Sequence, residues 1–159
     1  MSKKKIKLAK DAFQVKGSVR VELRDEHGNL KQSHDEHNLI VTVGKTYLAA
    51  WLAAASQAGE FMTHIALGTG TTPPAASDTA LETEFAGGGY SRINGTLASS
   101  TNTWSNTAIF PPGNGTGAVT EAGLFSASTS GTMFARQTFS VYNKAAGDTL
   151  TVTWSVSFS

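Results

Sequence analysis

The sequence predicts an all-β protein with one short helix, and three observations support this class. Several short stretches alternate apolar and polar residues with the period of two that a half-buried strand requires. Glycine- and proline-rich turn segments separate these stretches at short intervals. Charged residues make up 16% of the 159 residues, well below the roughly 25% of ordinary domains. We therefore expect an antiparallel β-sandwich, a jelly-roll-like body or an open barrel.

The length suits one domain, and a chain of this size buries enough surface to fold without covalent cross-links. The sequence has no cysteine, which excludes disulfides and thiolate metal sites. We divide the chain into a basic N-terminal arm, residues 1–16, and a single β domain, residues 17–159. We expect the lysines of the arm to bind a partner: Lys3, Lys4, Lys5, Lys7, Lys10 and Lys16.

Residues 19–43 predict a β-hairpin. Val19, Val21 and Leu23 alternate with charged residues, which is the pattern of a strand with one buried face. The turn at residues 25–29 contains Gly28, which tolerates positive φ. The return strand ends in an apolar stretch at residues 39–41, and its polar middle, residues 34–37, is expected to be exposed.

Residues 43–57 predict the helix. Thr42 is a candidate N-cap, and Gly59 is a candidate terminator. We expect the helix to cover one end or one face of the β structure, with Trp51 in the core. Apolar residues at helical spacing define its buried side: Val43, Tyr47, Leu48, Trp51, Leu52 and Ala55.

The remaining chain predicts strands joined by turns. We expect strands at residues 64–68, 91–97, 103–110, 118–125, 133–142 and 149–159. A loop with two prolines follows the first of these, and residues 78–84 are expected to form a short helical turn. The last strand has the clearest pattern, because one face is apolar and the other carries only Thr and Ser.

No residue pattern indicates an enzyme, a cofactor site or a metal site. In an extended segment His34 shares a face with Glu36, and Asp35 shares one with His37, whereas a divalent ion usually takes three or four protein ligands. Residues 68–72 lack the Lys-Ser/Thr ending of a phosphate loop. Glu121 lies in an otherwise apolar strand, so we expect a structural ion pair with Arg136 or Arg92 rather than catalysis.

Neither a membrane nor a nucleic acid is an expected partner. No apolar stretch approaches the roughly 20 residues of a membrane span, and residues 6–13 are too interrupted by charge for a signal-peptide core. The lysines of the arm are not interleaved with arginine or aromatic residues, which argues against nucleic-acid binding. We expect a protein made in the cytoplasm of its host cell.

Four segments of the chain resemble segments of small tailed-phage virion proteins. They are IALGTGTTPPAASDTALETE (residues 65–84), VTEAGLF (119–125), TMFAR (132–136) and GDTLTVTW (147–154). The resemblance extends over residues 38–159 and contains no catalytic motif. It implies a virion structural protein, either a capsid decoration (cement) protein or a tail, neck or fibre-associated module.

The short chain and the basic arm favour the decoration protein. Proteins of that kind are commonly homotrimers on the capsid exterior, so the expected partners are the major capsid protein and further copies of the chain. A carbohydrate-binding module is a further alternative, in which Trp104, Tyr90 or Tyr142 would stack against a sugar.

Overall fold

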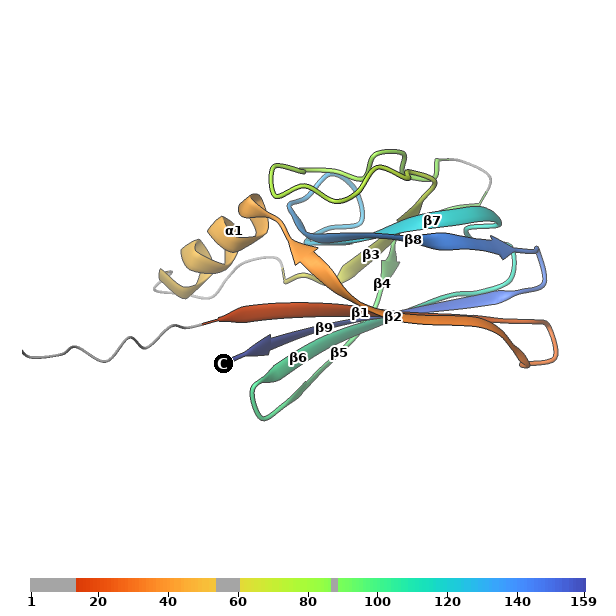
Figure 1. The fold of residues 1–159 in the computed structure, drawn as a ribbon, viewed down its shortest axis with the longest axis horizontal. Helices are drawn as coiled ribbons and strands as arrows, with labels where there is room; N and C mark the ends of the chain where they lie inside the picture. The colour runs from red at the N-terminus through yellow and green to blue at the C-terminus, as the bar shows by residue number, and fades with distance from the viewer. Residues whose placement is uncertain (1–13, 54–60, 87–88) are drawn as a thin grey trace, which may run out of the picture.

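The computed structural model describes residues 14–53, 61–86 and 89–159. Within them the chain forms nine strands and one helix (Figure 1). The elements are β1 (Val15–Arg24), β2 (Leu30–Ile40), α1 (Thr42–Ala53), β3 (His64–Gly68), β4 (Ile93–Asn94), β5 (Thr96–Ser100), β6 (Thr103–Phe110), β7 (Gly117–Phe125), β8 (Met133–Lys144) and β9 (Thr149–Phe158).

The strands form one antiparallel, nearly closed, barrel-like sheet in the order β4-β3-β7-β8-β2-β1-β9-β6-β5. β2 joins its two halves, because it pairs with β1 along most of its length and with β8 only at Leu39 and Ile40. The predicted all-β class with one helix is confirmed. The helix lies at the end of the sheet from which β1 starts and at which β9 finishes (Figure 1).

The two edges of the sheet are consecutive in the chain. β4 pairs with β3, and directly after Gly95 the chain continues as β5 and pairs with β6. Two hydrogen bonds hold the seam together: Gly95 N–H donates to the Thr63 carbonyl, and Asn106 Nδ2 donates to the Met62 carbonyl. The sequence predicted a single strand over residues 91–97, which the structure divides at this point.

The core consists of the inward-facing residues of the strands. On β9, Leu150, Val152, Trp154 and Val156 are fully buried, and the Thr and Ser residues between them face outward, as the sequence predicted. Each such side chain contributes about 1.5–3 kcal/mol of transfer free energy before conformational entropy is counted. Phe158, the last residue of this series, is only half-buried.

The helix packs on β8 through a glycine. Gly44 is the buried residue of α1, and a Cβ at this position would lie 2.7 Å from the Phe134 Cα. The carbonyl of Val41 accepts the first helical hydrogen bond, from Lys45 N–H, so Thr42 is the first helical residue and not the cap. Ala55 and Gly59 lie outside the described residues.

The expectation that Trp51 belongs to the core is wrong. Its side chain is half-buried, and Leu52, expected on the same buried side, is 64% exposed. Close packing through Gly44 explains the difference, because the helix approaches the sheet at its first turn and leaves its later turns at the rim.

The loop between β3 and β4 covers the outer face of β7. Residues 121–125 of β7 are therefore buried on both faces. Residues 78–84 form no helical turn; Thr69 N–H instead donates to the Thr83 carbonyl, and Phe85 N–H to the Leu67 carbonyl. A second, smaller apolar cluster fills the space between loop and sheet: Val41, Ala66, Leu81, Phe125 and Met133.

Candidate functional site

The strongest polar cluster lies under this loop and is centred on Glu121. Its carboxylate is fully buried and accepts hydrogen bonds from the backbone N–H groups of Gly70 (3.0 Å), Thr83 (2.8 Å) and Glu82 (3.2 Å). Arg136 Nε donates to it at 2.9 Å. The predicted ion pair with Arg136 is confirmed, and it ties the loop to β7 and β8.

Arg136 extends the cluster to two further carboxylates. Its Nη1 donates to Asp78 Oδ2 at 2.9 Å, and its Nη2 lies 3.6 Å from Glu82 Oε2. Burial opposes the positive charge of Arg136, but the hydrogen bonds to Glu121 and Asp78 outweigh burial and raise its pKa. Hydrogen bonds from the backbone and hydroxyl of Thr72 lower the pKa of Glu82. The groups that bind these carboxylates therefore also fix the loop to the sheet.

Arg92, the other predicted partner of Glu121, pairs with a different carboxylate. Its Nε and Nη2 donate to the two oxygens of Glu84 at 2.7 and 2.8 Å, and its guanidinium lies 3.7 Å from the centre of the Phe125 ring. Nη1 donates to the carbonyls of Ala127 and Ser130. Residues 65–84, 119–125 and 132–136 therefore meet in structural contacts.

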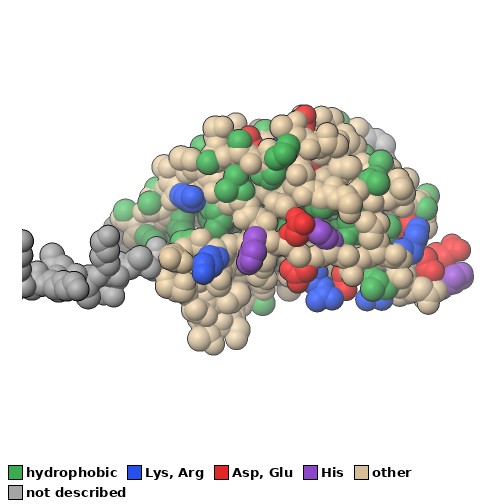
Figure 2. Space-filling model, viewed as in Figure 1, with side chains coloured by type: hydrophobic (Ala, Val, Ile, Leu, Met, Phe, Trp, Pro, Cys, Tyr) green, Lys and Arg blue, Asp and Glu red, His purple; other side chains and the backbone are tan. Residues whose placement is uncertain are grey.

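The polar segment of β2 is exposed, as predicted. His34 Nε2 lies 2.8 Å from Glu36 Oε1 on the expected shared face, and Glu36 also accepts a hydrogen bond from Gln137. Among the described residues, no group of three or more His, Cys, Asp or Glu side chains is placed to hold a metal ion. Figure 2 shows charged and histidine side chains gathered along the β1–β2 hairpin and a mostly uncharged surface elsewhere on this face.

The predicted partner-binding lysines are only partly within the described residues. Lys3, Lys4, Lys5, Lys7 and Lys10 lie outside them. Lys16 belongs to β1, where it is exposed and pairs with Ser157 of β9, so it is part of the sheet rather than of the arm. Of residues 1–16, Val15 and Lys16 thus belong to the β structure.

A face rich in hydroxyl groups covers the outer side of β9 and β6. The outward residues face each other in register, with Ser105 opposite Ser155 and Thr107 opposite Thr153, whose hydroxyls lie 3.0 Å apart. All are half-exposed, and Ile109 at one end is 56% exposed. We call this set the hydroxyl face: Thr103, Ser105, Thr107, Thr151, Thr153, Ser155 and Ser157.

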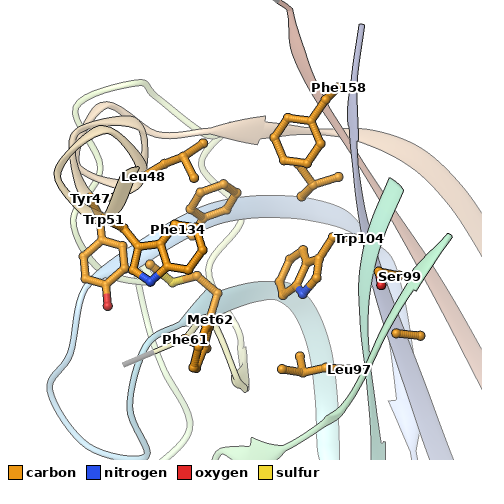
Figure 3. Close-up of a pocket in the computed structure, with 12 residues that line it drawn as sticks. Tyr47, Leu48, Trp51, Phe61, Met62, Leu97, Ser99, Trp104, Phe134 and Phe158 are labelled. Atoms are coloured by element: carbon orange, nitrogen blue, oxygen red, sulfur yellow. The ribbon is translucent and has the colours of Figure 1, made fainter. Parts of the chain in front are cut away.

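An open apolar groove of about 500 Å³ lies between α1 and the inner side of β5, β6 and β9. Figure 3 shows Tyr47, Leu48 and Trp51 of the helix on one side and Trp104 and Leu97 of the strands on the other. Phe61 and Leu97 are 52% and 40% exposed. Six aromatic side chains line the groove: Tyr47, Trp51, Phe61, Trp104, Phe134 and Phe158.

The aromatic residues named for sugar stacking have different environments. Tyr142 is fully buried, and burial raises its pKa to about 12. The Tyr90 hydroxyl accepts a hydrogen bond from Leu67 N–H at 2.8 Å, and burial raises its pKa strongly. Trp104 lines the groove. The structure therefore does not bring the three together into one sugar-stacking surface.

Sequence reasoning missed the groove altogether. Its lining comes from the helix, the segment before β3 and four different strands, and no local pattern reveals such a combination. One signal was present: the inward series of β9 ends at Phe158, so a large apolar residue stands at the end of a strand.

Comparisons of the chain with protein-family models, with curated proteins and with solved structures gave no match. Within residues 14–53, 61–86 and 89–159, no helix is both long and apolar enough to cross a membrane.

Proposed function

We propose that this chain is a structural component of a tailed-phage particle, and specifically a head decoration protein that binds the major capsid protein on the outer shell. The observation that carries the proposal is the hydroxyl face. The resemblance of residues 65–84, 119–125, 132–136 and 147–154 to virion proteins supports it as well. The protein would be made in the host cytoplasm and would act by binding, without catalysis.

The hydroxyl face suits contact with a protein lattice. Its side chains are uncharged and short, so neighbouring copies do not repel each other and a partner surface can approach closely. Hydroxyl groups donate and accept hydrogen bonds, and interfaces of stable complexes carry about one hydrogen bond per 100–200 Å². A stable complex buries roughly 1,200–2,000 Å² in total, so the face would need additional contacts.

The lysines near the N-terminus would supply part of those contacts. In this proposal Lys3, Lys4, Lys5, Lys7 and Lys10 bind an acidic groove between capsid subunits. A homotrimer would present three such segments and three hydroxyl faces, and simultaneous binding would raise the overall affinity without new kinds of contact. Removal of residues 1–10 should therefore lower the occupancy of particles.

The first test is the number of copies per purified particle, measured by quantitative mass spectrometry against the major capsid protein. A decoration protein should approach parity with the shell subunit. A dozen copies or fewer would contradict the proposal and would assign the chain to the tail or neck.

A pair of variants tests the hydroxyl face itself. Ser105→Lys with Ser155→Lys places two positive charges opposite each other on the face, whereas Ser140→Lys places one on the exposed part of β8. We expect the double variant to lose particle occupancy and the β8 variant to keep it. Equal occupancy of both variants would remove the hydroxyl face from the interface.

A further inference from the structure

The apolar groove leaves two large apolar side chains exposed to solvent, Phe61 and Leu97. The rings of Trp51 and Phe61 pack edge to face with their centroids 6.1 Å apart. Trp104 faces them across the groove (Figure 3). Among its lining residues only Ser99 adds a polar side chain beyond the Tyr47 hydroxyl and the indole N–H groups. The groove therefore fits apolar side chains and offers little to a charged or sugar ligand.

One end of the chain enters the described structure beside this groove. Gln14 and Ser159 exchange two backbone hydrogen bonds, at 2.6 and 3.0 Å, and Val15 pairs with Phe158, which lines the groove. Gln14, the first described residue, therefore lies at the rim of the groove. Fully extended, 13 residues span at most roughly 45 Å, which is enough to reach a neighbouring molecule.

Within residues 5–8 an extended segment would have one apolar and one basic side, and Lys4 and Lys10 would flank the apolar side. Ile6 and Leu8 share one face, and Lys5 and Lys7 share the opposite face. Two aliphatic side chains two residues apart match an apolar groove, and the lysines between them would remain in water. Lys3, Lys5 and Lys7 on the basic side would stay available for the contacts proposed above.

The direction of β1 indicates that the N-terminal segment binds the groove of a neighbouring copy rather than the groove of its own chain. β1 leads away from the barrel at Val15, so a segment must reverse its direction to reach its own groove. Residues 9–13 contain neither glycine nor proline, and Asp11 is their single turn-forming residue. A segment that continues outward instead reaches the next molecule.

We propose that the groove binds Ile6 and Leu8 from the N-terminal segment of a second copy of this chain. When every copy gives its segment to the next, the contacts are head-to-tail, and they form a ring if the rotation between copies closes and an open filament if it does not. The proposal concerns the purified protein alone, so its test does not depend on whether the chain is a virion protein.

Because the chain has no cysteine, a disulfide between two introduced cysteines tests the proposal directly. Chains with Leu8→Cys are mixed with chains carrying Ser99→Cys, unfolded and refolded together, and oxidised. We expect a cross-linked product of two chains, one of each kind. The matched control replaces Ser99→Cys by Ser140→Cys, which is exposed on β8 outside the groove, and should give only traces of that product.

A chain that carries both Leu8→Cys and Ser99→Cys shows whether the segment binds the groove of its own chain or that of another copy. A disulfide that forms only within one chain would overturn the proposal, because the segment would then bind its own groove. No disulfide in either experiment would overturn it too, since the groove would then be covered by something else or remain open.

Oligomeric state gives a second readout. Ile6→Ser with Leu8→Ser should convert the oligomer to monomer in light scattering after size exclusion, and should shift tryptophan emission to longer wavelength as Trp51 and Trp104 become hydrated. Lys5→Ser with Lys7→Ser changes the opposite face and should keep the oligomer. A full chain that is monomeric at every concentration would contradict the proposal.

Discussion

At the scale of single residues, the most buried charge of the described structure belongs to Glu121. Three backbone N–H groups and Arg136 surround its carboxylate, and the side chain of Arg136 is itself only 3% exposed. Buried ion pairs add little stability compared with a well-packed apolar pair, but removal of one partner leaves the other charge unpaired in the interior. Replacement of either Glu121 or Arg136 alone should therefore lower the stability of the protein.

Arg136→Met should lower the free energy of unfolding by about 3–5 kcal/mol, because the buried carboxylate of Glu121 then loses its cationic partner. Arg20→Met is the matched control: Arg20 pairs with Glu22 on the surface with 59% of its side chain exposed, and the expected loss stays below about 1 kcal/mol. Urea denaturation of both variants measures the two values. Equal losses would contradict a structural role for the buried pair.

A second charged contact should make stability depend on pH. Asp148 Oδ2 accepts hydrogen bonds from Lys31 Nζ at 2.6 Å and from Ala145 N–H at 2.9 Å, and these lower its pKa from the ordinary value of 3.8. A lowered carboxyl pKa stabilises the folded state above the ordinary pKa, and the contribution disappears as the pH falls through the folded-state pKa.

Asp148→Asn should therefore lower the melting temperature at pH 7, and its difference from the unchanged chain should shrink as the pH falls below about 4. Thermal melts followed by circular dichroism between pH 2 and pH 7 measure this difference. Asp35→Asn removes the same charge from an exposed position of β2 and should have little effect. A difference for Asp148→Asn that is independent of pH would contradict the explanation.

At the scale of elements, the position of α1 depends on one close contact. A Cβ on Gly44 would meet the backbone of Phe134, which cannot move without disturbing β8. Helix propensity alone predicts that alanine is better than glycine by about 1 kcal/mol. The two effects have opposite signs, so one substitution separates them.

Gly44→Ala should destabilise the protein by about 1–3 kcal/mol, because the helix must move away from β8. Lys45→Ala, at the exposed neighbouring position, should change stability by less than about 0.5 kcal/mol. Chemical denaturation gives both values, and the fluorescence of Trp51 reports the position of the helix. A stabilising Gly44→Ala would mean that propensity dominates and that the contact is loose.

The elements also show what a sequence reveals and what it does not. The strands with one buried face were predictable, because alternation along β1 and β9 reports that face directly. The loop after β3 was misread as partly helical, because its conformation is set by hydrogen bonds to Glu121, which lies about 40 residues further along the chain. A pattern within the loop does not record such a distant partner.

The same reasoning applies to the candidate sites. The pairing of Glu121 with Arg136 was predictable, because a lone carboxylate in an apolar strand requires a cation. The groove was not, because α1 meets β5, β6 and β9 only through the closure of the sheet. Trp51 satisfied the helical pattern for a core residue and nevertheless lies at the rim of the groove.

At the scale of the whole molecule, closure of the sheet depends on β9. This strand lies between β1 and β6 and pairs with each of them along nearly its full length. A chain that stops at Asp148 leaves β1 and β6 without their shared neighbour and removes four buried side chains from the core. The last strand of the described residues is thus a central strand of the sheet.

A chain truncated after Asp148 should show no near-ultraviolet circular dichroism of a packed core and no cooperative thermal transition. A chain that lacks only Ser159 loses one end of the pairing with Gln14 and should fold with nearly unchanged stability. Cooperative unfolding of the longer truncation would show that the other eight strands are sufficient for the fold.

The central position of β9 has a consequence for the chain during its synthesis. At about 5–20 residues per second, the ribosome needs roughly 6–25 s to proceed from the end of β1 to the start of β9. Throughout that interval β1 lacks its partner on one side and risks pairing with other nascent chains. The β1–β2 hairpin is also where charged side chains are concentrated, and charge of this kind opposes aggregation of exposed strands. The charge of the hairpin thus opposes the aggregation of β1 during the time in which this strand lacks β9.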